Sequence, residues 1–124
     1  MEKNYLVKAK LRLRAAELLA SAKLWCAAAS NCYYALFNLM QAVVGTPPGK
    51  RWKHKGIVKI FCKTCREKSL LPAPLLEEVA EKAYELYELR RIADYSPTLS
   101  IDEIDVNLFL KWVGTLIREV EDER

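Results

Sequence analysis

The longest apolar stretch of the chain covers residues 25–44, and no charged residue interrupts it between Lys23 and Lys50. A stretch of about 20 such residues could cross a bilayer as a helix. Drawn as a helix, however, it carries one stripe of uncharged polar side chains: Asn31, Tyr34, Asn38 and Gln41. Hydrocarbon disfavours such a stripe. The pattern therefore predicts the central helix of a bundle, with the stripe facing another helix, a second subunit or a site.

Elsewhere, apolar residues recur every three or four positions, which is typical of amphipathic helices. This spacing predicts a helix over about residues 4–19, a break near residues 20–23, a short helix after residue 55, a long helix from Pro74 to about Asp94, and a last helix beyond residue 100. In the long helix the inward residues are expected to be Leu75, Leu76, Val79, Ala80, Ala83 and Tyr87. In the last helix they are expected to be Ile104, Leu108, Trp112, Leu116 and Val120.

Breaks between these helices coincide with turn-forming residues. The segment Gly45–Gly49 contains two prolines and ends the central helix, because proline cannot donate the helical hydrogen bond. Ser96 and Pro97 form a turn, and Ser100 with Glu103 has the spacing of a capping box. No strand pattern competes. The sequence predicts one all-α domain over residues 1–124, an antiparallel up-and-down bundle of four main helices plus one short helix.

The N-terminal residues lack the uninterrupted apolar run of a secretory signal, so we expect a cytoplasmic protein with no membrane span. The four cysteines are expected to be buried thiols rather than a disulfide framework: Cys26, Cys32, Cys62 and Cys65. Cys62 and Cys65 form a lone CxxC pair, with no second pair at ligand spacing. A zinc site would need other ligands to converge on this pair: Cys26, Cys32 or His54. We therefore predict no metal site and no cofactor.

Charge divides the chain into opposed parts. Residues 1–44 carry six Lys/Arg against two Glu, residues 45–69 carry eight against one, and residues 70–124 carry six against thirteen acidic residues. The basic segment near residue 50 has the ingredients of a nucleic-acid contact, with cations around an aromatic ring. Its candidate residues are Lys50, Arg51, Trp52, Lys53, His54 and Lys55. The alternative, which we favour, is a solvated loop with Trp52 packed against the end of the bundle.

Two charged residues fall on the apolar line of the long helix. Arg90 and Asp94 stand one turn apart, on the same side as Ala83 and Tyr87. Burying either charge alone would be costly, so the spacing predicts an Arg90–Asp94 ion pair against the polar stripe or a partner subunit. Such a pair has two interpretations, a structural pair that fixes helix register or part of a functional cleft.

Three short motifs resemble the HEPN domain family, in the prokaryotic branch often encoded beside a minimal nucleotidyltransferase. They are residues 33–37 (YYALF), residues 54–56 (HKG) and the segment from Arg90 to Tyr95 (RRIADY). This resemblance implies a helical bundle that forms a homodimer, with the arginine motif in a cleft near the dimer axis. It also implies nucleotide or RNA recognition within a toxin–antitoxin or related module. The cleft residues expected on this basis are Arg90, Asp94, Tyr95, Asn31, Tyr34 and Asn38.

The arginine motif departs from the family's ribonucleases, which have a histidine four to six residues after the arginine. Tyr95 stands five residues after Arg90, and no histidine follows it. Catalysis could then use only Arg90 with Tyr95 or with the sole histidine, His54, so we lean toward a protein that is not itself an enzyme. The main hypothesis is a recognition subunit partnered by a nucleotidyltransferase. The alternatives are a metal-independent ribonuclease toxin and a structural dimerisation module.

Overall fold

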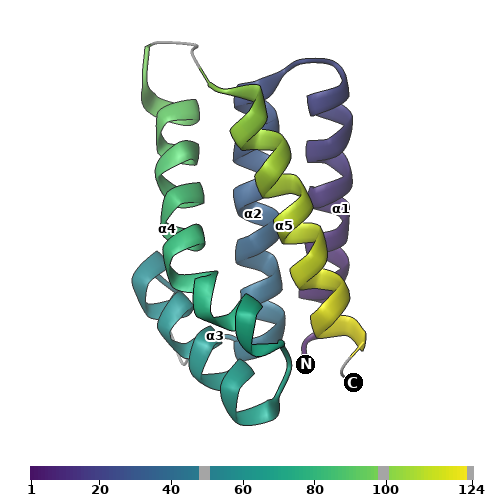
Figure 1. Cartoon of the computed structure of the whole chain (residues 1–124), viewed down its shortest axis with the longest axis vertical. Helices are drawn as coiled ribbons and strands as arrows, with labels where there is room; N and C mark the ends of the chain where they lie inside the picture. Colours follow the sequence, from purple (N-terminus) through teal and green to yellow (C-terminus); the bar gives the residue numbers. More distant parts are fainter. Residues whose placement is uncertain (48–50, 98–100, 123–124) are drawn as a thin grey trace.

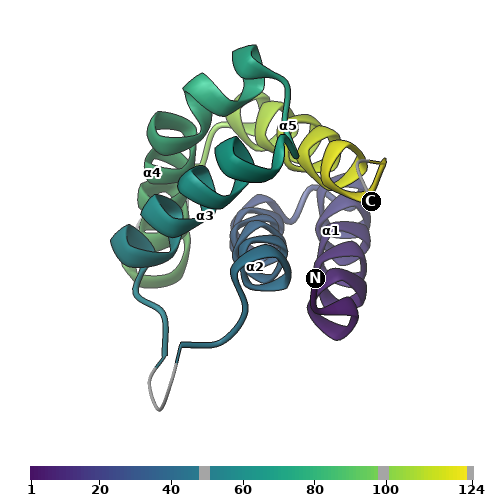
Figure 2. The same ribbon diagram turned by 90° about the horizontal axis from the view of Figure 1, so that it is seen from below.

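The protein is described here by a computed structural model covering residues 1–47, 51–97 and 101–122, in which the regular structure is entirely helical. The helices are α1 (Lys3–Ser21), α2 (Trp25–Val44), α3 (His54–Lys68), α4 (Ala73–Tyr95) and α5 (Glu103–Asp122). Helices α1, α2, α4 and α5 alternate in direction, and the shorter α3 crosses one end of the bundle (Figures 1 and 2). The predicted all-α up-and-down bundle is confirmed.

Helix α2 is the centre of the bundle and packs against each of the other four helices. Its bounds match the predicted residues 25–44. Small side chains let α1 approach closely, and they are fully buried or nearly so in both helices: Ala9, Ala16, Ala28, Ala29 and Ala35. Within the described ranges, none of the helices combines the length and the apolar character needed to span a bilayer.

The helix ends follow from local chemistry. The break after α1 is a tight turn in which Lys23 adopts a positive φ of 61° and the Leu24 amide donates to the Leu19 carbonyl. Gly45 ends α2 at φ 77°, a conformation that L-residues rarely adopt. Asp102 Oδ1 accepts a hydrogen bond from the Ile104 amide (2.8 Å) and so caps α5. The capping residue expected from the sequence, Ser100, lies outside the described residues.

Three predicted core positions are wrong. Ile104 and Leu108, near the start of α5, are 64% and 60% exposed, whereas Trp112, Leu116 and Val120 farther along the same face are buried as predicted. In α4, Ala80 is exposed and Leu86 is fully buried instead. Periodicity gave the correct helix in each case, and Val79 and Ala83 in α4 are buried as predicted.

Candidate functional site

Arg90 on α4 lies among the rings of four tyrosines. Its guanidinium carbon is 4.9 Å from the ring centre of Tyr33, 5.4 Å from Tyr34, 5.6 Å from Tyr87 and 5.9 Å from Tyr95. These distances are within the range of cation–π attraction. Tyr33 and Tyr34 come from α2, whereas the other two rings come from α4. We call these five residues, together with Asp94, the Arg90 cluster.

The Arg90–Asp94 ion pair predicted from helical spacing is confirmed. Arg90 Nη1 lies 3.6 Å from Asp94 Oδ2, and the two side chains are 13% and 27% exposed. Burial acts to lower the pKa of Arg90, but Tyr34, Tyr33 and Asp94 together raise it above its ordinary value. The Nε atom of Arg90 is buried and has no hydrogen-bond partner among the described residues. The guanidinium is therefore charged and has a donor unused.

His54 joins the cluster from the first residue of α3. Its Nδ1 lies 3.2 Å from the Tyr33 hydroxyl, and its ring stacks on Tyr87 with centres 4.4 Å apart. Burial, followed by the positive charge of Arg90, lowers the pKa of His54, while Glu88 opposes the shift. Burial raises the pKa of Tyr33 to about 12, although Arg90 counteracts it. Near neutral pH, His54 is thus a neutral imidazole beside a protonated phenol.

The predicted polar stripe of α2 is divided between two environments. Tyr34 lies between two guanidinium groups, with Arg12 5.5 Å from its ring centre on the side of α1. Asn31 donates to the Ala27 carbonyl, and Asn38 donates to Gln41. The hydrogen bonds of Asn31 and Asn38 thus remain within α2. Of the three cleft residues predicted on this helix, the structure places Tyr34 against Arg90.

The residues of the predicted basic patch lie in different environments. Trp52 Nε1 donates to the Gly45 carbonyl (2.6 Å), so the half-buried indole closes the base of the loop rather than standing free as an aromatic platform. This confirms the favoured interpretation of Trp52. Arg51, Lys53 and Lys55 are exposed, His54 belongs to the Arg90 cluster, and Lys50 lies outside the described residues.

Sequence reasoning missed three members of the site. Tyr33 was noted only within the YYALF motif, although its ring lies nearest to Arg90. Tyr87 was assigned only to the core, although its position one turn before Arg90 was a signal that the two side chains share a face. Arg12 on α1 contacts Tyr34, and no sequence pattern connects the two residues. Tyr95 is 75% exposed and forms the outer edge of the cluster.

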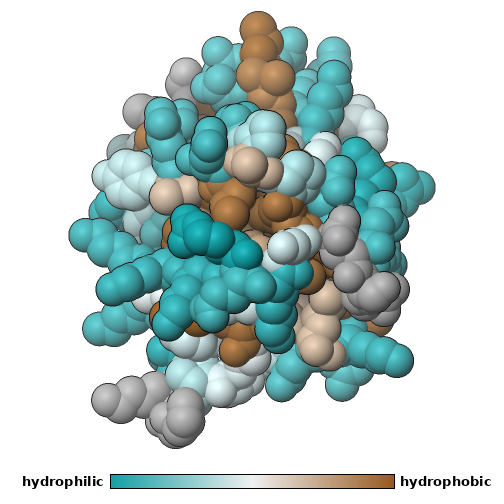
Figure 3. All heavy atoms as spheres, turned by 60° about the horizontal axis from the view of Figure 1, so that its bottom comes forward, coloured by the Kyte–Doolittle hydropathy of each residue, from teal (hydrophilic) through white to brown (hydrophobic). Residues whose placement is uncertain are grey.

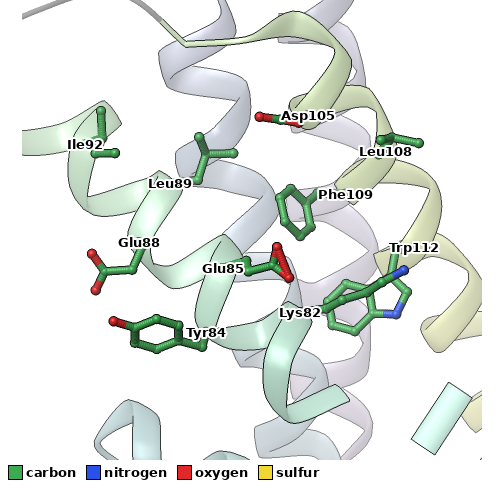
Figure 4. A pocket seen from close by; sticks show the side chains of 10 residues that line it. All are labelled: Lys82, Tyr84, Glu85, Glu88, Leu89, Ile92, Asp105, Leu108, Phe109 and Trp112. Carbon is green, nitrogen blue, oxygen red and sulfur yellow. The ribbon is translucent and has the colours of Figure 1, made fainter. Parts of the chain in front are cut away.

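A separate groove of about 500 Å³ lies between α4 and α5 (Figure 4). Leu89, Phe109 and Trp112 lie between the two helices, and the Glu85 carboxylate is directed into the same space. Further acidic and apolar residues line its edges: Glu88, Ile92, Asp105 and Leu108. The groove therefore has an apolar floor and a mainly acidic rim, and Lys82 lies over the Trp112 ring.

The four cysteines are free thiols, with Cys32 and Cys65 buried and Cys26 and Cys62 half-buried. Burial raises the pKa of both Cys32 and Cys65 to about 12, so these two thiols are protonated and unreactive near neutral pH. The described ranges hold no group of three or more His, Cys, Asp or Glu side chains arranged to bind a metal ion.

Comparison with known proteins places this arrangement in a family. A curated relative, "Putative toxin MJ0142" from Methanocaldococcus jannaschii, is 30% identical over 103 residues, which is 83% of this chain and 67% of the relative. The model of the HEPN domain family matches residues 3–123. The chain belongs to the HEPN domain family.

Proposed function

We propose that this HEPN domain is the nucleotide- or RNA-recognition subunit of a toxin–antitoxin-like module, partnered by a nucleotidyltransferase. The setting of Arg90 carries the proposal. Its charge is balanced by one partly exposed carboxylate, its Nε has no partner among the described residues, and four aromatic rings surround it. The similarity to a relative named as a putative toxin supports the module.

A phosphorylated nucleotide could bind both the guanidinium and the aromatic rings of the cluster. Phosphate oxygens can accept from the guanidinium, whose planar arrangement of donors suits an anion of this shape. A base can stack on a tyrosine, and the exposed ring of Tyr95 is the most accessible of the four. Asp94 would then hold Arg90 in place before the ligand arrives.

Binding to Arg90→Ala and Arg91→Ala variants tests this proposal. Arg91 is the matched control, since it lies next in sequence but is exposed and pairs with Glu88 at 3.2 Å. Titration of a labelled mixed-sequence RNA and of a labelled adenosine nucleotide should show at least a tenfold loss for Arg90→Ala, because a charge-assisted hydrogen bond contributes ~1.5–3 kcal/mol. Equal affinities of the two variants would refute a phosphate site at Arg90.

We further propose a homodimer formed through the face where α1 and α2 meet. Val7, Leu11 and Leu18 leave an apolar stripe exposed along α1. Leu11 and Asn38 line the same shallow depression of about 270 Å³, next to Arg12. Arg12 in turn lies over Tyr34, so this face leads directly to the Arg90 cluster. A second copy seated here would cover the stripe and bring two clusters near one axis.

The groove between α4 and α5 is the surface we propose for the nucleotidyltransferase. Its acidic rim suits a basic amphipathic segment, and its apolar floor would bury that segment's other face. Copurification with a co-expressed minimal nucleotidyltransferase should be lost with Leu108→Asp and kept with Leu11→Asp. For the dimer we expect the opposite: Leu11→Asp should disrupt it, and Leu108→Asp should leave it intact. If both variants still copurify with the partner, this surface is refuted.

A second candidate function is metal-independent RNA cleavage, which the position of His54 favours. The fold supplies near Arg90 the imidazole that the arginine motif lacks, and its lowered pKa leaves it near neutral pH in the unprotonated form that a general base requires. His54 would take the proton of a 2′-hydroxyl, the 2′-oxygen would attack phosphorus, and the 5′-oxygen would leave with a proton from water. Arg90 would stabilise the charge on the phosphoryl oxygens.

We expect recognition without cleavage by the isolated chain. Stacking on Tyr87 and the contact with Tyr33 hold the imidazole inside the cluster, half-buried. Wild type and Arg90→Ala, purified identically, should leave a mixed RNA pool equally intact. Cleavage by wild type that both Arg90→Ala and His54→Phe abolish would establish the ribonuclease instead.

A further inference from the structure

The groove between α3 and α4 has a composition opposite to that of its neighbour. It encloses about 600 Å³, and its basic lining residues all come from α3: Lys55, Lys59, Lys63 and Arg66. No carboxylate appears among its described lining residues. Val58, Cys62 and Ala80 provide an apolar floor. Tyr84, 53% exposed, stands on the opposite wall and also borders the acidic groove.

The three lysines recur every four residues along one helix. Four residues of α-helix advance by about 6 Å and turn about 40° beyond a full turn, so their stems form a slightly inclined row with nearly even steps. Consecutive phosphates of a single nucleic-acid strand recur at a similar interval. An acidic protein segment would not need such regular spacing, and the apolar floor beside it suits the flat faces of bases. Figure 3 brings this end of the molecule forward, with hydrophilic side chains around exposed apolar surface.

His54 connects the groove to the Arg90 cluster. It lines the end of the groove and contacts Tyr33 and Tyr87, the two rings that Arg90 also approaches. We propose that the α3–α4 groove binds the backbone of a single-stranded nucleic acid, with phosphates along the lysine row and a base on Tyr84. The strand then runs past His54 to the Arg90 cluster. This proposal extends the proposed function to a polymer longer than one nucleotide.

The experiment compares a charge-removing variant of the groove with a matched control. The groove variant is Lys55→Ala/Lys59→Ala/Lys63→Ala. The control, Lys23→Ala/Lys111→Ala/Arg118→Ala, removes the same charge from exposed positions of α5 and of the turn between α1 and α2. Ligands are a labelled dinucleotide and labelled RNA and DNA strands of about eight nucleotides, within the usual site size of a single-strand groove.

For the longer strand, the groove variant should lose about 100-fold in affinity at ~0.1 M salt, and its log–log salt slope should fall by about 2, since each phosphate contact contributes ~0.7. The control should keep most of the affinity. Tyr84→Ala should lose roughly tenfold and Tyr84→Phe almost nothing, as expected for stacking. Dinucleotide binding should depend on Arg90 but not on the lysine row. RNA and DNA strands that bind alike indicate readout of backbone and bases, whereas RNA preference indicates contacts to the 2′-hydroxyl.

Several results would overturn the groove. One is that the longer strand binds no tighter than the dinucleotide. Another is that the groove variant and the control lose affinity equally. A third is that a duplex binds as well as the single strand. Loss with Arg90→Ala but not with the groove variant would leave the proposed function standing without the groove. Loss of affinity with the groove variant but not with Arg90→Ala would leave the groove standing and refute the phosphate site at Arg90. Absence of any binding by wild type would refute both.

Discussion

Tyr33 is only 2% exposed, yet its hydroxyl reaches the single histidine of the chain and its ring lies under Arg90. Three helices therefore meet at this one residue, which belongs to α2 and contacts side chains of α3 and α4. Because burial keeps the phenol protonated, the hydroxyl can donate to a neutral imidazole at Nδ1. The geometry of the candidate site depends on this contact.

The titration of His54 should make stability depend on pH. Its pKa is lowered in the folded state, so below about 6.5 the unfolded chain binds a proton more readily. The contribution of His54 is therefore complete above that pH and is lost as the pH falls toward the folded-state value. His54→Phe keeps the stacked ring and removes the titration. In thermal melts between pH 5 and 8, the melting temperature of His54→Phe should fall less with decreasing pH than that of wild type. Parallel plots of melting temperature against pH would contradict the prediction.

Removing Asp94 should cost more than removing Arg91. Asp94→Ala leaves the mostly buried Arg90 without its carboxylate, at a cost of ~1–2 kcal/mol. Arg91 is 54% exposed and pairs with Glu88 on the surface, so Arg91→Ala should change the free energy of unfolding by less than ~0.5 kcal/mol. Urea unfolding of both variants measures the difference. Equal losses would mean that the ion pair does not stabilise the fold.

These residues also mark the limit of sequence reasoning about the site. The Arg90–Asp94 pair was predictable because both residues lie on one helix, where spacing fixes the geometry. The meeting of His54 with Tyr33 and Tyr87 was not, because it depends on how α3 crosses the end of the bundle. Helical periodicity carries no information about such a crossing.

At the scale of the helices, two glycines at helix ends should respond in opposite ways to substitution. Gly56 lies in the first turn of α3, and an added Cβ would meet Trp52 Cε3 at 3.9 Å, an ordinary contact. Gly56→Ala should stabilise by ~0.5–1 kcal/mol. Gly45 ends α2 at φ 77°, so Gly45→Ala should destabilise by ~1–3 kcal/mol although the space around it is open. Chemical denaturation measures the free energy of unfolding of both variants. A loss of stability in Gly56→Ala would show that this position requires glycine for a reason other than helix propensity.

The helices themselves were largely readable from the sequence. The bounds of α2 follow from a charge-free run and the glycine and prolines after it, which act locally. The inward face of α5 was partly wrong, because Leu108 follows the same periodicity as the buried Trp112 and Leu116. Which apolar residues of a helix are covered depends on its neighbours, and α5 leaves Leu108 beside an open groove.

At the scale of the whole molecule, we expect a dimer in solution. The exposed apolar stripe of α1 contains Leu11, 64% exposed, beside the half-buried Asn38, whose Oδ1 has no partner among the described residues. Light scattering at tens of micromolar protein should give twice the monomer mass, and Leu11→Asp should give the monomer mass. A monomer mass for wild type would return the polar stripe to an intramolecular role.

The two grooves that Tyr84 borders place positive charge along α3 beside negative charge along the rim between α4 and α5. A polyanion diffusing toward the protein would experience a torque before any contact forms, and productive collisions would be those with α3 leading. Recognition would then be fast and selective in orientation at the encounter itself. Rising ionic strength should lower the association rate constant and change the dissociation rate constant much less. Stopped-flow mixing can measure both rate constants.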